Sequence, residues 1–340
     1  MTRSHPFFLA LALAASLASG PASASITKMV VFGDSLSDSG NLYNMTGGAF
    51  PTSPPYAQRF SNGPVAVESL AANLGVALAP SIFGGSNYAV AGAATGPVAS
   101  NLGAYAGTFD SYVAFAAPPL VGLNGLTGMD KQVAAYLGGP LGGLSETLFV
   151  LWGGSNDLFL DPTAPTMSQA VINLGDEINA LIGAGATRFL VPDMPDWSLT
   201  PEGLASTAGN RAYMSGLNTQ FNSDLAALIA SLEAANPTVD IIGFDSNALL
   251  RDVLVNATAY GFNFTTTSCV GDGCFLTPDL ADQYMFWDPV HPGARLNQII
   301  GAAFAQAVPE PGSVLLLCAG LLPMLWLRRS SARRNRVLVA

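Results

Sequence analysis

A serine near the start of the chain and a histidine near its end are the residue types that nucleophilic catalysis needs. Ser35 lies in the sequence Gly-Asp-Ser-Leu, directly after an apolar run that ends at Gly33. His291 is one of only two histidines among the 340 residues, and the other is His5. Because a serine hydroxyl needs a base that titrates near neutral pH, this pair predicts a serine hydrolase with Ser35 as nucleophile and His291 as base. A helix N-cap, a position that serine favours, is the alternative role for Ser35.

The segment around His291 supplies a third group for the same chemistry. Asp288 lies three residues before the histidine, so its carboxylate can turn back, orient the imidazole and stabilise the charged ring. Pro289 and Pro292 stiffen the loop that carries both side chains. An ordinary exposed loop histidine is the alternative, and the apolar, proline-rich setting argues against it.

Two further segments can supply hydrogen-bond donors to a negatively charged oxygen. Asn156 follows an apolar run over 147–152 and two glycines, and its amide can donate to the oxyanion that develops during acyl transfer. Gly92 follows a weaker apolar run over 87–90 and offers a backbone N–H. Each of these groups, like the N–H of Ser35, can donate to such an oxygen, and Gly92 is by itself the weakest signal of the three. A plain strand-to-helix turn is the alternative for the segment around Asn156.

The candidate residues follow short apolar runs that are typical of buried strands. These runs cover residues 28–32, 87–90, 147–152, 189–191 and 239–242. Apolar residues between the later runs recur in steps of three and four, as on one face of an amphipathic helix. The two clearest stripes are Met167, Val171, Leu174, Ile178, Leu181 and Tyr213, Leu217, Phe221, Leu225, Leu228. This alternation predicts an α/β fold with a parallel sheet and a site at the carboxyl ends of its strands. Residues 47–128 are less regular and predict long loops over that site.

Charge and cysteine content restrict the partners and the compartment. Residues 25–308 contain 7 basic and 22 acidic residues, a net charge of −15, which repels phosphate backbones and predicts no nucleic-acid partner. Cys269 and Cys274 flank a short glycine-rich loop and predict a local disulfide in an oxidising compartment. A metal site is the weaker alternative, because His291 is the only histidine after residue 5. We therefore expect no bound metal.

Both ends of the chain predict targeting segments that flank a domain over residues 25–307. Residues 1–24 have a weakly positive start, an apolar run and the small-residue pattern Ala-Ser-Ala, which predict a cleaved signal peptide. The alternative is an N-terminal membrane anchor, for which this apolar run is short. Residues 308–340 contain Val-Pro-Glu-Pro-Gly, an apolar run over 314–327 and five arginines in the last 13 positions.

That final order of features resembles the PEP-CTERM sorting signal of Gram-negative bacteria. The resemblance implies transient membrane anchoring through the apolar segment as a transmembrane helix, followed by processing by an exosortase. It also implies an exported protein in the periplasm, at the cell surface or outside the cell.

The four segments that carry the candidate residues resemble the SGNH, or GDSL, hydrolase family, in which they occur in this order. The opening segment is most similar to the branch with plant GDSL lipases and bacterial lysophospholipase- or haemolysin-like enzymes. The resemblance implies a flavodoxin-like, three-layer α/β/α sandwich around a five-stranded parallel sheet. It implies a catalytic set of Ser35, Asp288 and His291, with an oxyanion hole formed by Ser35, Gly92 and Asn156. No metal or organic cofactor is required for this chemistry.

The function expected from these features is an exported serine esterase or lipase that hydrolyses small-molecule or lipid esters through an acyl-enzyme. Several apolar residues between 104 and 126 can hold an acyl chain or belong to the core: Tyr105, Phe109, Tyr112, Val113 and Phe115. Two alternatives remain open. One is an O-acetyl-polysaccharide esterase acting on exopolysaccharide, and the other is a non-catalytic surface or matrix protein on the same scaffold.

Overall fold

The computed structural model describes residues 25–100, 107–116 and 118–309, and residues 26–308 form one compact unit. The predicted signal peptide and nearly all of the predicted C-terminal sorting signal lie outside the described residues. Within the described ranges, no helix is both long enough and apolar enough to cross a membrane.

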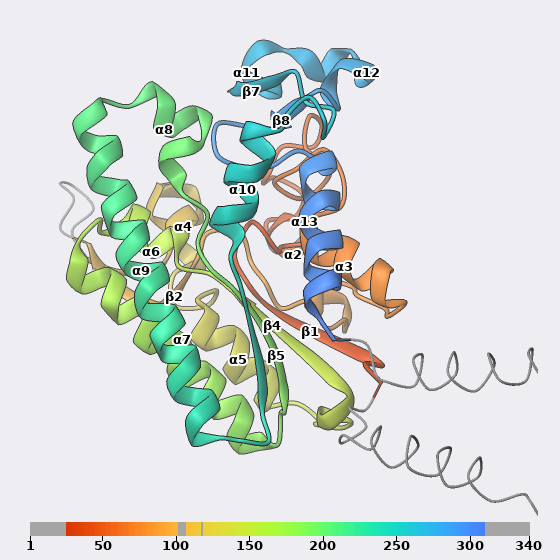
Figure 1. The fold of residues 1–340 in the computed structure, drawn as a ribbon, viewed down its shortest axis with the longest axis vertical. Coiled ribbons are helices and arrows are strands. Elements are labelled where there is room, and N and C mark those ends of the chain that lie inside the picture. The colour runs from red at the N-terminus through yellow and green to blue at the C-terminus, as the bar shows by residue number, and fades with distance from the viewer. Residues whose placement is uncertain (1–24, 101–106, 117, 310–340) are drawn as a thin grey trace, which may run out of the picture. The chain divides into compact units, whose positions relative to one another are not determined.

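A parallel sheet forms the centre of the domain (Figure 1). Its four strands lie in the order β1, β4, β5, β6 and pair in parallel throughout. The strands are β1 (Lys28–Gly33), β4 (Thr147–Trp152), β5 (Arg188–Pro192) and β6 (Asp240–Phe244). Every residue of β4 and β5 is buried, as the continuous apolar runs predict for strands covered on both faces.

The predicted strand over 87–90 occupies the fifth position of the sheet without forming a regular strand. Asn87 forms a parallel bridge with Val31 of β1, and the N–H of Val90 donates to the Gly33 carbonyl at 3.1 Å. On its other edge this segment bonds to a side chain, because the N–H of Ala89 donates to the side-chain oxygen of Asn87 at 3.0 Å. The α/β fold with its parallel sheet is thus confirmed, with four regular strands and one bridged segment in place of the five strands predicted.

Helices cover both faces of the sheet, and alternate residues of each strand pack against each layer. Helices α5 (Met129–Leu137), α7 (Ala164–Ala184) and α9 (Ala208–Ala235) share one core cluster with strand residues such as Phe32 and Phe149. The other face packs against α3 (Ala66–Leu74) and α13 (Ala294–Ala307). Figure 1 shows α7 beside α9 in one layer and α13 beside α3 in the other.

Shorter elements lie at the carboxyl end of the sheet and around it. The remaining helices are α2 (Asn41–Met45), α4 (Tyr112–Ala116), α6 (Ser155–Leu160), α8 (Pro201–Ala205), α10 (Ser246–Val255), α11 (Cys269–Asp272) and α12 (Pro278–Ala281). The remaining strands are β2 (Ala93–Ser100), β3 (Gly107–Ser111), β7 (Phe264–Ser268) and β8 (Tyr284–Phe286). The antiparallel pair β2–β3 lies inside the region 47–128, where the sequence predicted loops.

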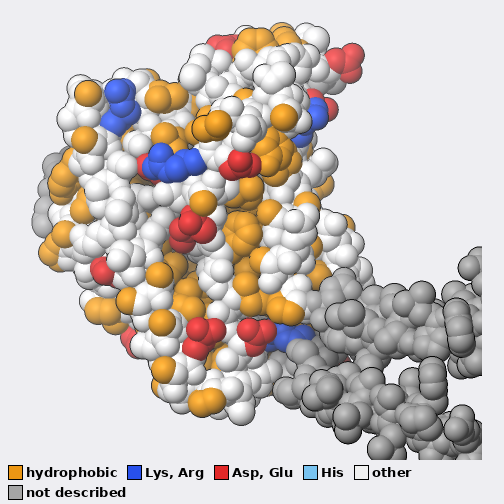
Figure 2. All heavy atoms as spheres, viewed as in Figure 1, with side chains coloured by type: hydrophobic (Ala, Val, Ile, Leu, Met, Phe, Trp, Pro, Cys, Tyr) orange, Lys and Arg blue, Asp and Glu red, His pale blue; other side chains and the backbone are white. Residues whose placement is uncertain are grey.

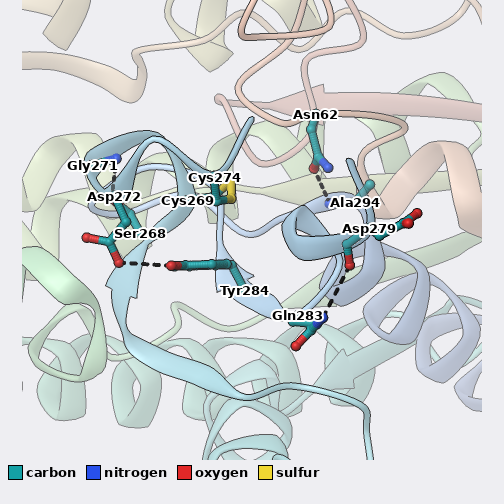
Figure 3. Close-up of a disulfide and its surroundings, with 10 residues drawn as sticks. All are labelled: Asn62, Ser268, Cys269, Gly271, Asp272, Cys274, Asp279, Gln283, Tyr284 and Ala294. Carbon is teal, nitrogen blue, oxygen red and sulfur yellow. Dashed lines mark hydrogen bonds between the residues drawn. A yellow bond between two sulfur atoms is a disulfide. The ribbon is translucent and has the colours of Figure 1, made fainter. Parts of the chain in front are cut away.

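Residues 264–287 form a small lobe held by the disulfide between Cys269 and Cys274, whose Cα atoms are 4.9 Å apart (Figure 3). The hydroxyl of Tyr284 donates to Asp272 at 3.1 Å, and the N–H of Val270 donates to the carbonyl of Trp287 at 2.9 Å. Trp287 packs in one buried cluster with both cysteines and immediately precedes Asp288. The lobe therefore fixes the chain just before the loop that carries Asp288 and His291.

Replacing Cys269 and Cys274 with alanine should lower the free energy of unfolding by about 2 kcal/mol, the loop-closure value for so short a loop. Urea denaturation of the variant and of wild-type protein, each with and without dithiothreitol, measures the effect. Wild-type protein in dithiothreitol should match the variant. Equal midpoints for wild type in both conditions would contradict a stabilising disulfide.

Candidate active site

The residues predicted to do chemistry converge at the carboxyl end of the parallel sheet. Ser35 lies two residues after β1, and Asn156 lies in the first turn of α6, after β4. Parallel strands bring these ends to one edge, as the sequence pattern predicts. His291 arrives from the other end of the chain, in the loop between β8 and α13.

The structure places Ser35, His291 and Asp288 in a continuous chain of hydrogen bonds. The Nε2 atom of His291 lies 2.8 Å from the Oγ atom of Ser35. The Nδ1 atom lies 2.9 Å and 2.8 Å from the two carboxylate oxygens of Asp288. These contacts have the order nucleophile, base and orienting acid that proton removal from a serine hydroxyl requires.

The Asp288 carboxylate is almost fully buried, yet its surroundings keep it ionised. Burial raises the pKa of Asp288, but the adjacent His291 ring and two backbone N–H donors outweigh burial and leave the pKa below its ordinary value. The donors are the N–H groups of Val290 at 3.0 Å and His291 at 2.8 Å. An ionised Asp288 favours the protonated imidazolium that forms when His291 accepts a proton.

Two aromatic side chains that the sequence analysis did not single out complete this arrangement. The hydroxyl of Tyr56 donates to Oδ2 of Asp288 at 2.9 Å. Burial, together with the Asp288 charge, raises the pKa of Tyr56, which keeps the hydroxyl protonated as a donor. The ring of Phe60 packs on the imidazole of His291 with a centroid separation of 4.7 Å. Both residues precede α3 in an irregular segment with no strand or helix pattern, so only the tertiary contacts reveal them.

The predicted oxyanion donors lie beside Ser35 and line the same cleft. Gly92 has φ of 85°, and an added Cβ there would lie 2.5 Å from a methyl carbon of Val113, so glycine is required by conformation and by space. The side-chain nitrogen of Asn156 donates to the carbonyl of Ala93 at 2.9 Å and to Asp34 at 3.3 Å. The bond to Ala93 holds the Asn156 amide beside the segment that carries Gly92.

The buried carboxylate of Asp38 ties the serine loop to the Gly92 segment. It accepts from the N–H groups of Gly40, Asn41 and Leu42 on its own side of the cleft. It also accepts from the N–H of Ala91 at 2.8 Å, next to the predicted donor Gly92. The Asp38 side chain therefore sets the spacing between the loop that follows Ser35 and the segment that carries Gly92, which are two of the three parts of the predicted oxyanion hole.

Two other buried carboxylates lie close to this hole. Burial raises the pKa of Asp34 to about 6, against a hydrogen bond from the Leu36 N–H that lowers it. Burial raises the pKa of Asp157 to about 7, against hydrogen bonds from Thr95 that lower it. The Thr95 N–H and hydroxyl lie 2.9 Å and 2.7 Å from Asp157, so this carboxylate joins α6 to β2.

A largely apolar cleft of about 450 Å³ opens beside the Ser35 hydroxyl. Its apolar lining includes Leu36, Phe50, Phe60, Tyr112, Val113, Trp152, Phe159, Trp197, Leu249, Leu250 and Phe286. Tyr112 and Val113, two of the predicted acyl-chain contacts, line this cleft. Phe109 packs instead beside a small core cluster around β2, while Tyr105 and the side chain of Phe115 lie outside the described residues.

The chain matches the family model for GDSL-like lipases and acylhydrolases over residues 29–304. It belongs to this family. A GDSL esterase/lipase of Arabidopsis thaliana is 29% identical over 326 residues, which cover 82% of each chain. A phosphatidylcholine-sterol acyltransferase of Aeromonas hydrophila is 26% identical and is matched over 84% of this chain and 78% of its own length. The crystal structure of a lipolytic G-D-S-L protein from Veillonella parvula is 14% identical, with a TM-score of 0.41, and covers 83% of this chain and 97% of its own.

Membership of the GDSL family identifies the chain as a carboxylic ester hydrolase. The family match spans the four segments that carry the predicted site residues. The expected class of enzyme is therefore confirmed, while the roles assigned to individual residues remain predictions that rest on the geometry described above.

Replacing Ser35 with alanine should lower kcat for a p-nitrophenyl ester on the order of a million-fold, as in other serine hydrolases that lose the nucleophile. Ser37→Ala is the matched control, because the buried Ser37 hydroxyl has no hydrogen-bond partner within the described part of the chain. That control should retain wild-type turnover. Near-wild-type turnover in the Ser35→Ala enzyme would reject Ser35 as nucleophile.

Asp288→Asn should lower kcat/KM by about 10³ to 10⁴, and His291→Ala should lower it further, because Asp288 only orients and stabilises the base. Tyr56→Phe removes one donor to Asp288 and should lower kcat/KM about tenfold. Wild-type kcat/KM in Asp288→Asn would exclude Asp288 as the partner of His291.

Asp157→Asn should stabilise the protein more at pH 8 than at pH 5. In the folded protein the pKa of Asp157 is about 7, above the ordinary 3.8. Proton binding by this carboxyl group therefore stabilises the folded wild-type protein fully below about pH 4, and this stabilisation is lost as the pH rises through 7. The amide keeps the shape and removes the buried charge. The melting temperature of the variant minus that of wild type should therefore be about 4 °C larger at pH 8 than at pH 5.

Thermal unfolding of both proteins at the two pH values measures this difference against a wild type that has the same other buried acids. Asp176→Asn, on the exposed side of α7, is the control for loss of an acidic charge. A shift of the same size in that control, or no change with pH in Asp157→Asn, would contradict the assignment.

Proposed function

We propose that this GDSL hydrolase is an exported serine esterase or lipase that cleaves carboxylic esters with an extended apolar acyl chain. One observation carries the proposal. The Ser35 hydroxyl is hydrogen-bonded to His291 and faces an apolar cleft of about 450 Å³.

Each step of the proposed reaction uses groups that lie at or beside the cleft. His291 accepts the proton of Ser35 as its oxygen attacks the ester carbonyl, and Asp288 stabilises the imidazolium. The N–H groups of Ser35 and Gly92, with the amide of Asn156, stabilise the negative oxygen of the tetrahedral intermediate. His291 then donates its proton to the leaving alcohol, and the acyl group stays on Ser35. Water, activated by the same histidine, releases the carboxylic acid.

The size and lining of the cleft favour a longer acyl chain over an acetyl group. An acetyl group would leave most of the cleft unfilled, and Phe50, Leu249 and Leu250 would then face water. This observation argues against the O-acetyl-polysaccharide esterase. The complete set of hydrogen bonds from Ser35 to Asp288 argues against a non-catalytic matrix protein.

The proposed export rests on the two ends of the sequence. The signal-like segment 1–24 and the PEP-CTERM-like segment 308–340 support passage through the inner membrane of a Gram-negative bacterium, with exosortase processing at the C-terminal end. The Cys269–Cys274 disulfide is in keeping with an oxidising compartment. The mature enzyme would act in the periplasm, at the cell surface or in the medium.

A series of p-nitrophenyl esters from acetate to decanoate tests the acyl-chain proposal. We expect kcat/KM to rise by about fourfold for each added CH₂ group until the cleft is full, since burying one CH₂ group contributes about 0.8 kcal/mol. Leu249→Trp should fill part of the cleft and move the optimum to a shorter chain. A maximum at acetate would support the deacetylase instead, and failure both to turn over any ester and to react with a fluorophosphonate probe would support the matrix protein.

A further inference from the structure

Three aromatic rings and one carboxylate form a continuous wall at the mouth of the cleft. The ring centroids of Tyr112 and Phe159 are 5.6 Å apart, and those of Phe159 and Trp197 are 6.4 Å apart. The indole N–H of Trp197 donates to the Glu202 carboxylate at 3.1 Å. All four side chains line the cleft that contains Ser35 and His291, and we call them the aromatic–acidic wall.

The outer end of the wall is joined to the loop that carries His291. Glu202 is exposed to solvent, whereas the three rings are partly buried, so the carboxylate marks the outer end of the wall. The backbone N–H of Glu202 donates to the carbonyl of Pro289 at 2.9 Å, which joins α8 to the loop that carries His291. His291 is the group that protonates the leaving alcohol, so the alcohol part of a bound ester lies near this loop.

The charge on the wall is not neutralised by a basic side chain within the cleft. Among the described residues that line it, none is lysine or arginine. Two arginines lie in this part of the fold without lining the cleft: Arg251 is hydrogen-bonded to Asp196 at 2.7 Å, and Arg211 donates to the backbone carbonyls of Leu204 and Ser206 at 3.0 Å and 2.9 Å. Burial and the Glu202 charge both raise the pKa of Tyr112, as expected for a hydroxyl that shares the cleft with this anion.

A site made of aromatic faces and one carboxylate favours the binding of organic cations. The electron-rich faces of tryptophan and tyrosine attract cations, and quaternary ammonium groups are bound in proteins by such aromatic surroundings. A carboxylate adds a Coulomb attraction that a neutral group of the same shape does not experience. The net charge of −15 over residues 25–308 adds long-range attraction of the same sign. Figure 2 shows only a few Lys and Arg side chains among hydrophobic ones on the viewed face.

We infer that the aromatic–acidic wall binds a quaternary ammonium group in the alcohol part of the substrate, so that the enzyme prefers choline-type esters. This inference rests on the proposed ester hydrolysis at Ser35 and adds a preference for the leaving alcohol. The acyl chain occupies the apolar interior of the cleft, and the trimethylammonium group lies against Trp197 beside Glu202.

A pair of esters with the same shape and different charge tests the inference. Butyrylcholine carries a trimethylammonium group, and 3,3-dimethylbutyl butyrate has carbon in place of that nitrogen. The measured quantity is the ratio of kcat/KM for the charged ester to kcat/KM for the neutral one. We expect a wild-type ratio well above one, and a fall of about fivefold in Glu202→Gln, the size of one partly exposed charge interaction. Trp197→Leu should lower the ratio by a similar factor through loss of the aromatic face.

Glu233→Gln is the matched control, because it removes the same charge from an exposed position at the far end of α9. Its ratio should equal that of wild type. Increasing the salt concentration should lower the wild-type ratio and change the Glu202→Gln ratio less, since only the former contains the screened attraction. Glu202→Lys, which reverses the charge, should lower the ratio further, and thermal unfolding checks that each variant is folded.

Hydrolysis of p-nitrophenyl butyrate, measured in the same experiment, distinguishes failure of the ammonium site from failure of the proposed esterase activity. If that ester is hydrolysed while the kcat/KM ratio of the charged to the neutral alkyl ester is near one, the proposed ammonium site is wrong and the proposed esterase activity is supported. A ratio above one that is unchanged in both Glu202→Gln and Trp197→Leu would also overturn the site. If no ester is hydrolysed, both the site and the proposed function are wrong.

Discussion

The hydrogen bond between Ser35 and His291 joins residues that are 256 positions apart in the chain, and much of the fold serves to hold that contact. The parallel sheet brings Ser35 to its edge from one side. From the other side, the amide oxygen of Asn62 accepts from the N–H of Ala294 at 2.7 Å, which fixes the start of α13 (Figure 3). Asn297 accepts from the N–H of Ala66 and donates to the carbonyl of Pro292. The histidine loop is thus fastened to the segment that leads into α3.

The residues that the sequence could locate are those whose position follows from a strong local pattern. Ser35 and Asn156 follow continuous apolar strands, so their place at the sheet edge is set by the strand direction alone. His291 stands out because so few histidines compete with it. Tyr56 and Phe60 have no such pattern, since their contacts with Asp288 and His291 depend on a loop path that only the packed structure specifies.

The same distinction applies to the fold. The main helices and strands follow from apolar periodicity, but the segment over 87–90 forms only isolated bridges, which join Asn87 to Val31 and to Pro80. Strands β2 and β3 were not predicted, because alanine, glycine and proline make up most of β2 and leave no clear alternation of apolar and polar residues. Their pairing, and the bond from Thr95 to Asp157, arise from tertiary contact and not from local preference.

The positions of Ser35 in the first strand–loop unit and of Asp288 and His291 just before the last described helix have a consequence for timing. During synthesis the proposed nucleophile is made first and the proposed base last, so a nascent or truncated chain has Ser35 without His291. Contacts between such distant segments also form late in folding, because long loops must close before they contribute stability. If Ser35 and His291 have the proposed roles, ester hydrolysis therefore begins only in a chain whose domain is complete and packed.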